Sequence, residues 1–101
     1  MHKRNYKTLD HIEHDYFTKH PEEIKSYLKV AMDEYQKDGN EKAFLAALSV
    51  AAKVHGGFSK LAKETGLNRE NLYRALSDKR DPKFSTVMHV LTALGVTLKV
   101  A

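Results

Sequence analysis

The chain has 101 residues, which suits one domain with an appended arm, and 42% of them are hydrophobic, enough for a small core. It has no cysteine, which excludes a disulfide framework and thiolate chemistry, and its formal net charge is +4. No apolar run approaches the about 18 residues of a membrane span, and the N-terminus lacks the apolar stretch of a secretory signal, so we expect a cytoplasmic protein.

Residues 1–40 predict an N-terminal arm followed by one helix. The arm, residues 1–20, shows no clean hydrophobic period, but it carries apolar side chains suited to docking on another surface: Tyr6, Leu9, Ile12, Tyr16 and Phe17. Pro21 suits a first helical position, and apolar residues recur after it at three- and four-residue spacing. We therefore predict a helix over residues 21–37, ended by the turn signal at residues 38–40.

Residues 41–101 predict a helical domain that ends in a strand. A wide apolar face predicts a buried helix over residues 41–55, and Gly56 and Gly57 end it, with His55 near its C-terminus. Two short amphipathic helices are predicted next, at residues 59–65 and 69–76.

The remaining signals concern turns and the C-terminus. Gly66 falls where we expect a positive φ, and Asn68 is a good N-cap for the second short helix. After a polar loop, a last helix is predicted over residues 84–94, with Ser85 as a candidate cap. Strict alternation over residues 96–100 predicts a short strand, which must pair with the arm or with a second chain.

The two short helices have the layout of a helix-turn-helix, whose second helix lies in a DNA major groove. Residues 58–83 carry seven Lys/Arg against four Asp/Glu, a local surplus of +3 that favours phosphate attraction. The side chains predicted to read bases are Arg69, Glu70, Tyr73 and Arg74. Those predicted to contact phosphates are Ser59, Lys60, Lys79, Arg80 and Lys83. Two alternatives stay open: Glu70 pairs with Arg74 at i,i+4 instead of touching a base, or the pair of helices is an ordinary hairpin without DNA.

Metal and enzymatic chemistry are the least favoured classes. His11 and His14 are three residues apart, with Asp15 and His20 nearby. A zinc site needs three or four ligands in a fixed geometry, often with cysteine, and this segment shows no clear helical pattern that would hold them so. We therefore predict solvated polar residues, with no metal and no cofactor, and a half-exposed His89 in the last helix. The sequence has neither a Gly-rich phosphate loop nor a nucleophile motif, so we do not expect an enzyme.

The stretch SKLAKETGLNRENLYRALSDKRDPKFSTVMHVLTALGVTL resembles the DNA-binding domain of phage repressors and Cro-type (Cro/C1, XRE-like) regulators. With PEEIKSYLKVAMDE and FLAAL before it, the chain resembles more closely the HigA-type addiction-module antidote proteins, over roughly residues 9–100. The fold class implied is all-α: a five-helix phage-repressor-like DNA-binding domain with an extra N-terminal helix or arm and a short C-terminal β-strand. We divide the chain into an N-terminal arm and helix at residues 1–40 and a helix-turn-helix DNA-binding domain with the C-terminal strand at residues 41–101.

The resemblance implies an antitoxin of a type II toxin–antitoxin module. Such a protein neutralises a RelE/ParE-like toxin and represses its own operon by binding double-stranded operator DNA as a homodimer. By position, Arg69, Glu70 and Tyr73 match base-reading residues, and Arg80 and Lys83 fall where related repressors touch phosphates.

The sequence departs from the family at the start of the bracing helix, where the common Gln is replaced by Phe58 and Ser59. The arm is the favoured site of toxin contact. The tyrosines and methionine of the N-terminal helix are read as a toxin-binding stripe or, preferably, as core: Tyr27, Met32 and Tyr35. The alternative function is a stand-alone helix-turn-helix transcriptional regulator without a toxin partner.

Overall fold

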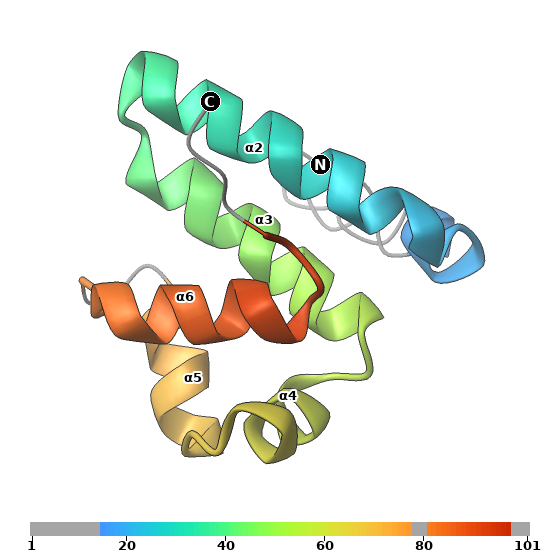
Figure 1. Cartoon of the computed structure of the whole chain (residues 1–101), viewed down its shortest axis with the longest axis vertical. Helices are drawn as coiled ribbons and strands as arrows, with labels where there is room; N and C mark the ends of the chain where they lie inside the picture. Colours follow the sequence, from blue (N-terminus) through green and yellow to red (C-terminus); the bar gives the residue numbers. More distant parts are fainter. Residues whose placement is uncertain (1–14, 78–80, 98–101) are drawn as a thin grey trace, which may run out of the picture.

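The computed structural model describes residues 15–77 and 81–97, and its regular elements within these ranges are all helical (Figure 1). Residues 15–19 are helical and precede a single 3₁₀ turn, η1. The elements that follow are η1 (Pro21–Glu23), α2 (Ile24–Asp38), α3 (Glu41–Val54), α4 (Phe58–Thr65), α5 (Arg69–Leu76) and α6 (Phe84–Ala93). No helix in the described ranges is long and apolar enough to cross a bilayer.

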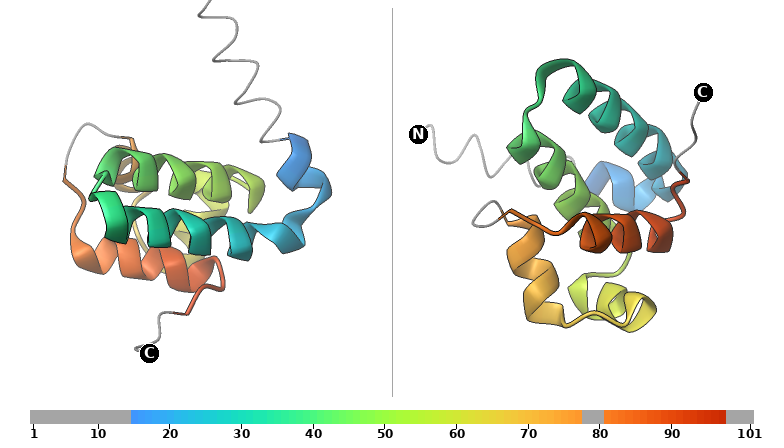
Figure 2. Two further views of the ribbon diagram at one scale, coloured as in Figure 1. Left: turned by 90° about the horizontal axis from the view of Figure 1, so that it is seen from above. Right: turned by 60° about the vertical axis from the view of Figure 1, so that its left-hand side comes forward.

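The two longest helices, α2 and α3, pack side by side as a hairpin (Figures 1 and 2). Gly39 ends α2 in the left-handed region at φ 67°, and its N–H donates to the Tyr35 carbonyl at 2.7 Å. Asn40 then caps α3, because its side-chain oxygen accepts from the Ala43 N–H at 3.1 Å. The turn predicted at residues 38–40 is confirmed, and two capping devices in succession reverse the chain there.

Every helix from α2 to α6 contributes to one core. The largest fully buried side chains come from all five: Leu28, Leu48, Leu61, Leu72, Val90 and Leu91. Tyr27 and Met32 pack against this core, which agrees with the preferred interpretation of that stripe. Tyr35 only partly agrees, since 40% of it is exposed while its ring lies against Phe44.

The end of the predicted arm belongs to the fold. Phe17, in the helical residues 15–19, is 8% exposed and packs on Tyr27, with 4.6 Å between ring centroids. Figure 2 shows these residues beside the start of α2. The expectation that Phe17 docks on another surface is therefore confirmed, and that surface is the core of the chain itself. The helix at residues 15–19 was not predicted, because the arm shows no clean hydrophobic period. Tyr6, Leu9 and Ile12 lie outside the described residues.

The last helix differs from the prediction at both ends. Ser85 is not the cap of α6; Lys83 occupies that position, without a side-chain cap bond, and Ser85 lies inside the helix. At the other end, the Val96 N–H donates to the Leu91 carbonyl at 2.9 Å, and Gly95 adopts φ 82°. This closing bond holds Val96 against the helix end, so Val96 and Thr97 are in no strand; residues 98–100 of the predicted strand lie outside the described residues.

Candidate nucleic-acid interface

The turn between α4 and α5 is held by its own side chains and by one glycine. Gly66 adopts φ 74°, and its N–H donates to the Ala62 carbonyl at 2.9 Å. The Thr65 hydroxyl donates to the Leu61 carbonyl at 2.9 Å and accepts from the Leu67 N–H at 3.2 Å. A Cβ at Gly66 would meet nothing within 4 Å, so the positive φ is what requires glycine there.

The helix α5 begins at a strong cap. The Asn68 side-chain oxygen accepts from the backbone N–H groups of Glu70 at 2.9 Å and Asn71 at 3.2 Å. Leu72 is fully buried and Leu76 is 2% exposed, so one side of α5 is fixed in the core. The opposite side is free to meet a partner.

The four predicted base-reading residues lie on the exposed part of α5: Arg69, Glu70, Tyr73 and Arg74. Tyr73 is 58% exposed, and the edge of its ring meets Phe58, the first residue of α4, with centroids 5.6 Å apart and planes at 79°. Phe58 therefore supports Tyr73 from the side. The sequence interpretation missed this pairing, since it treated Phe58 only as the replacement of a glutamine.

Glu70 and Arg74 form the i,i+4 pair that the sequence left open. The distance from Arg74 Nη2 to Glu70 Oε2 is 4.0 Å, and both side chains are more than half exposed. Such a pair is worth about 0.3–0.5 kcal/mol, so it orients Arg74 weakly and yields easily to a stronger partner. Among the described residues no acid is paired with Arg69.

The predicted phosphate-contacting residues divide into three groups. Ser59 and Lys60 are exposed in the first turn of α4. Lys83 is exposed at the N-cap of α6 and shares with Arg74 the lining of a groove of about 440 Å³ between α5 and α6, which His89, also exposed, lines as well. Lys79 and Arg80 lie outside the described residues. The structure thus brings one predicted base-reading cation and one predicted phosphate-contacting cation to the same groove.

A polar contact joins α4 to the end of α3. His55 Nε2 lies 2.6 Å from Glu64 Oε1, and the two side chains are 25% and 38% exposed. The predicted place of His55 at the helix terminus is confirmed, since it is the C-cap of α3. The contact with Glu64 spans nine residues across the glycine turn, a separation at which no helical or strand period points to a partner.

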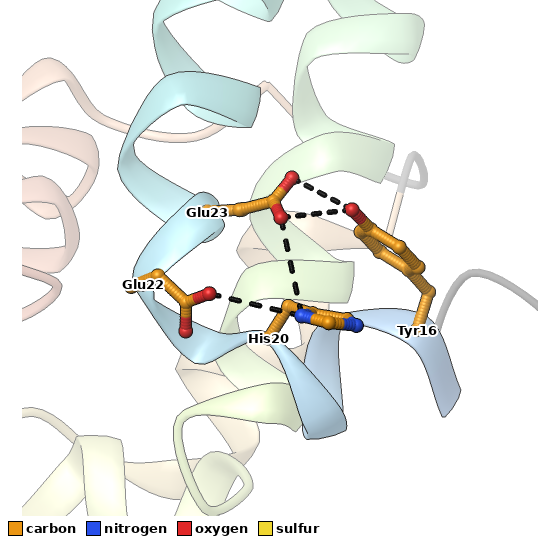
Figure 3. Close-up of polar contacts among 4 residues, drawn as sticks. All are labelled: Tyr16, His20, Glu22 and Glu23. Carbon is orange, nitrogen blue, oxygen red and sulfur yellow. Dashed lines mark hydrogen bonds and ion pairs between the residues drawn. The ribbon is translucent and has the colours of Figure 1, made fainter.

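Tyr16 and His20 meet the acidic side chains of η1, Glu22 and Glu23 (Figure 3). His20 Nδ1 lies 3.7 Å from Glu22 Oε2 and 4.0 Å from Glu23 Oε2. The Tyr16 hydroxyl lies 2.8 Å from both carboxylate oxygens of Glu23. That hydrogen bond raises the pKa of Tyr16 above its ordinary value of 10.0.

These contacts tie the helical residues 15–19 to η1. Of the residues considered for a metal, His20 is in this cluster, Asp15 is exposed, and His11 and His14 lie outside the described residues.

Residues 6–101 match the family described as probable addiction module antidote protein. A protein of Haemophilus influenzae, itself described as uncharacterized, is 38% identical over 79 residues, which covers 78% of this chain and 76% of that protein. No solved structure matches. Because the family match covers nearly the whole sequence, the chain belongs to the family of probable addiction module antidote proteins.

Proposed function

We propose that this chain is the antitoxin of a type II toxin–antitoxin module. In this proposal it neutralises a RelE/ParE-like toxin and represses its own operon by binding operator DNA. The toxin half rests on the family, since an antidote acts against a toxin. The DNA half rests on one observation: α5 is capped, anchored on one side by buried leucines, and exposed on the other side with two arginines.

In the proposed complex, α4 and α5 act as a Cro/C1-type helix-turn-helix. Arg69 and Arg74 face base edges, where a guanidinium bonds guanine O6 and N7 in a bidentate way. Tyr73, held by Phe58, contacts a thymine methyl or a phosphate. Glu70 keeps Arg74 oriented until the helix enters the groove.

The start of α4 and the start of α6 flank this reading helix in the proposal. Ser59 and Lys60 offer a hydroxyl, an ammonium and free backbone N–H groups to one phosphate. Lys83 holds the backbone on the other side. Lys79 and Arg80 remain predicted phosphate contacts.

We further propose that the protein binds as a homodimer. One α5 covers only a few base pairs, and two copies related by a twofold axis match the two half-sites of a palindrome. Half-sites about 34–36 Å apart follow from one turn of B-DNA between the two reading helices.

Fluorescence anisotropy with the DNA upstream of this chain's gene tests the DNA half. Loss of one base contact costs about 1–3 kcal/mol, so Arg69→Ala should weaken binding roughly 5- to 150-fold and relax specificity at one position. Lys83→Ala should weaken binding to all sequences and reduce the salt slope by about one.

The matched control is Lys29→Ala, which removes the same single charge from the exposed surface of α2, at the end of the molecule away from α5 (Figure 1). Equal losses for Arg69→Ala and Lys29→Ala would mean that only overall charge matters. In that case α5 does not read bases, and the DNA half of the proposal fails.

A further inference from the structure

A second groove lies between α2 and α3, at the end of the molecule away from α4 and α5. It has a volume of about 200 Å³. Its lining consists of Tyr27, Val30, Ala31, Glu34, Tyr35, Asp38, Asn40, Ala43, Phe44 and Ala47. Figure 1 shows α2 and the start of α3 on the side of the molecule away from α5, although the rest of α3 contacts α4 and α5, so a partner seated here leaves the exposed side of α5 accessible.

The apolar part of this groove is exposed to solvent. Val30 is 58% exposed and Tyr35 is 40% exposed, although both are large apolar side chains on a helix that already contributes Leu28 to the core. The Tyr35 ring lies against Phe44, with 5.6 Å between centroids, so one aromatic pair joins α2 to α3 in the lining of the groove. Exposed apolar side chains that line a groove between two helices can seat the apolar side of a partner helix.

The groove is acidic, although the chain as a whole is basic. The protein has a net charge of +4, yet Glu34 and Asp38 are the charged residues in the lining, and none of the described lining residues is Lys or Arg. Asp38 accepts a hydrogen bond from the Asn40 N–H at 2.8 Å, whereas Glu34 has no ion-pair partner among the described residues. The groove therefore suits a cationic partner.

The lining residues on α2 follow one side of that helix, over a length that a partner helix can match. Those on α2 fall between residues 27 and 38 at three- and four-residue intervals, which places them along one side. Eleven residue steps extend about 16 Å, or three turns. An amphipathic helix of similar length can lie along this side and place apolar anchors between α2 and α3.

We propose that the α2–α3 groove docks a basic amphipathic helix of the toxin. This assignment rests on the proposed antitoxin function and names the surface and the charge that recognise the partner. A second copy of this chain is a poorer occupant, because a twofold contact through this face sets the carboxylates of Glu34 and Asp38 against the same pair in the other copy.

The test measures the affinity of the full-length chain for the purified toxin encoded beside its gene, by biolayer interferometry. Glu34→Lys and Val30→Lys should each weaken binding about tenfold or more, since both place a cation against a cationic helix. The matched control is Asp33→Lys, which makes the same charge change at the neighbouring exposed position outside the lining. It should bind within about twofold of wild type, a difference of about 0.4 kcal/mol.

Two further readouts separate the possible failures. The double variant Arg69→Ala/Arg74→Ala should keep full toxin affinity. If the wild-type chain itself does not bind the toxin, the antitoxin proposal fails and the groove assignment with it. If wild type binds but Glu34→Lys and Val30→Lys bind equally well, the groove assignment alone is refuted.

The free chain tests the other occupants. An open groove predicts that Val30→Lys leaves the melting temperature and the solution mass of the free protein unchanged, because Val30 is already exposed. A change in mass would show that a second copy sits there. A lower melting temperature at constant mass would show that the chain itself covers Val30. Either result overturns the proposal.

Discussion

The cap of α5 permits the most quantitative prediction. An α-helix leaves four N–H groups at its start without partners, and the Asn68 side chain satisfies two of them, on Glu70 and Asn71. Replacing an N-cap Asn with Ala costs about 0.5–2 kcal/mol, and the loss of two accepted bonds places Asn68→Ala in the upper half of that range. For a domain of this size, each kcal/mol lowers the melting temperature by about 4–8 °C.

Urea unfolding followed by circular dichroism measures this loss as a shift in midpoint at constant slope. Asn68→Ser is the matched control, since serine also accepts from the backbone and should lose little. The operator affinity of Asn68→Ala should fall too, because the loosened first turn carries Arg69 and Glu70. If Asn68→Ala and Asn68→Ser unfold at the same urea concentration, the side-chain cap does not support α5 and the reasoning is refuted.

Three further predictions concern the core, the turn and the N-terminal contact. Leu72→Ala should cost about 2–5 kcal/mol in urea unfolding because Leu72 is fully buried, whereas Tyr73→Ala should cost far less; similar losses would contradict this packing. Phe58→Ala should weaken operator binding by freeing Tyr73, with an edge-to-face pair worth about 0.5–1.5 kcal/mol; unchanged affinity would show that the support has no role. The phenol of Tyr16 should titrate above pH 10.0, with Tyr16→Phe identifying its signal by difference. Because the Tyr16 pKa is raised in the folded state, the hydrogen bond to Glu23 stabilises the fold fully below the ordinary pKa of tyrosine. This stabilisation is lost as the pH rises through the folded-state pKa, and Glu23→Gln should lower that pKa.

The α4–α5 unit was the best-predicted part of the fold. Gly66 and Asn68 have local backbone requirements, a positive φ and a side-chain cap, that sequence reveals directly. The end of α4 was therefore located correctly, and its predicted start at Ser59 was one residue late, since the helix begins at Phe58. Gly57 precedes α4 without a side chain to cap it, so the sequence carries no sharp signal for the first residue.

Contacts between side chains of different elements were not predictable from the sequence. Phe17 packs on Tyr27, and His55 meets Glu64, because three-dimensional packing brings different elements together. Phe84 shows that an apolar side chain in a predicted helix need not be buried. It is 77% exposed at the first turn of α6, before that helix reaches the core.

For the candidate interface, the sequence predicted which residues of α5 project outward. The exposure of Arg69, Tyr73 and Arg74 follows from the positions of Leu72 and Leu76, since a helix with one buried side has a defined free side. The support from Phe58 depends on how α4 crosses α5, and periodicity within either helix carries no information about that crossing.

In the proposed function one small chain holds two surfaces, one for operator DNA and one for a toxin. Both are tested together when the purified toxin is added to the complex of the chain with fluorescent operator DNA, and wild type is compared with Arg69→Ala/Arg74→Ala. Wild type should bind both partners. The double variant should lose the operator by at least about 25-fold, two contacts at about 1 kcal/mol each, while it still binds the toxin. Operator binding that survives this double substitution would show that α5 does not read DNA.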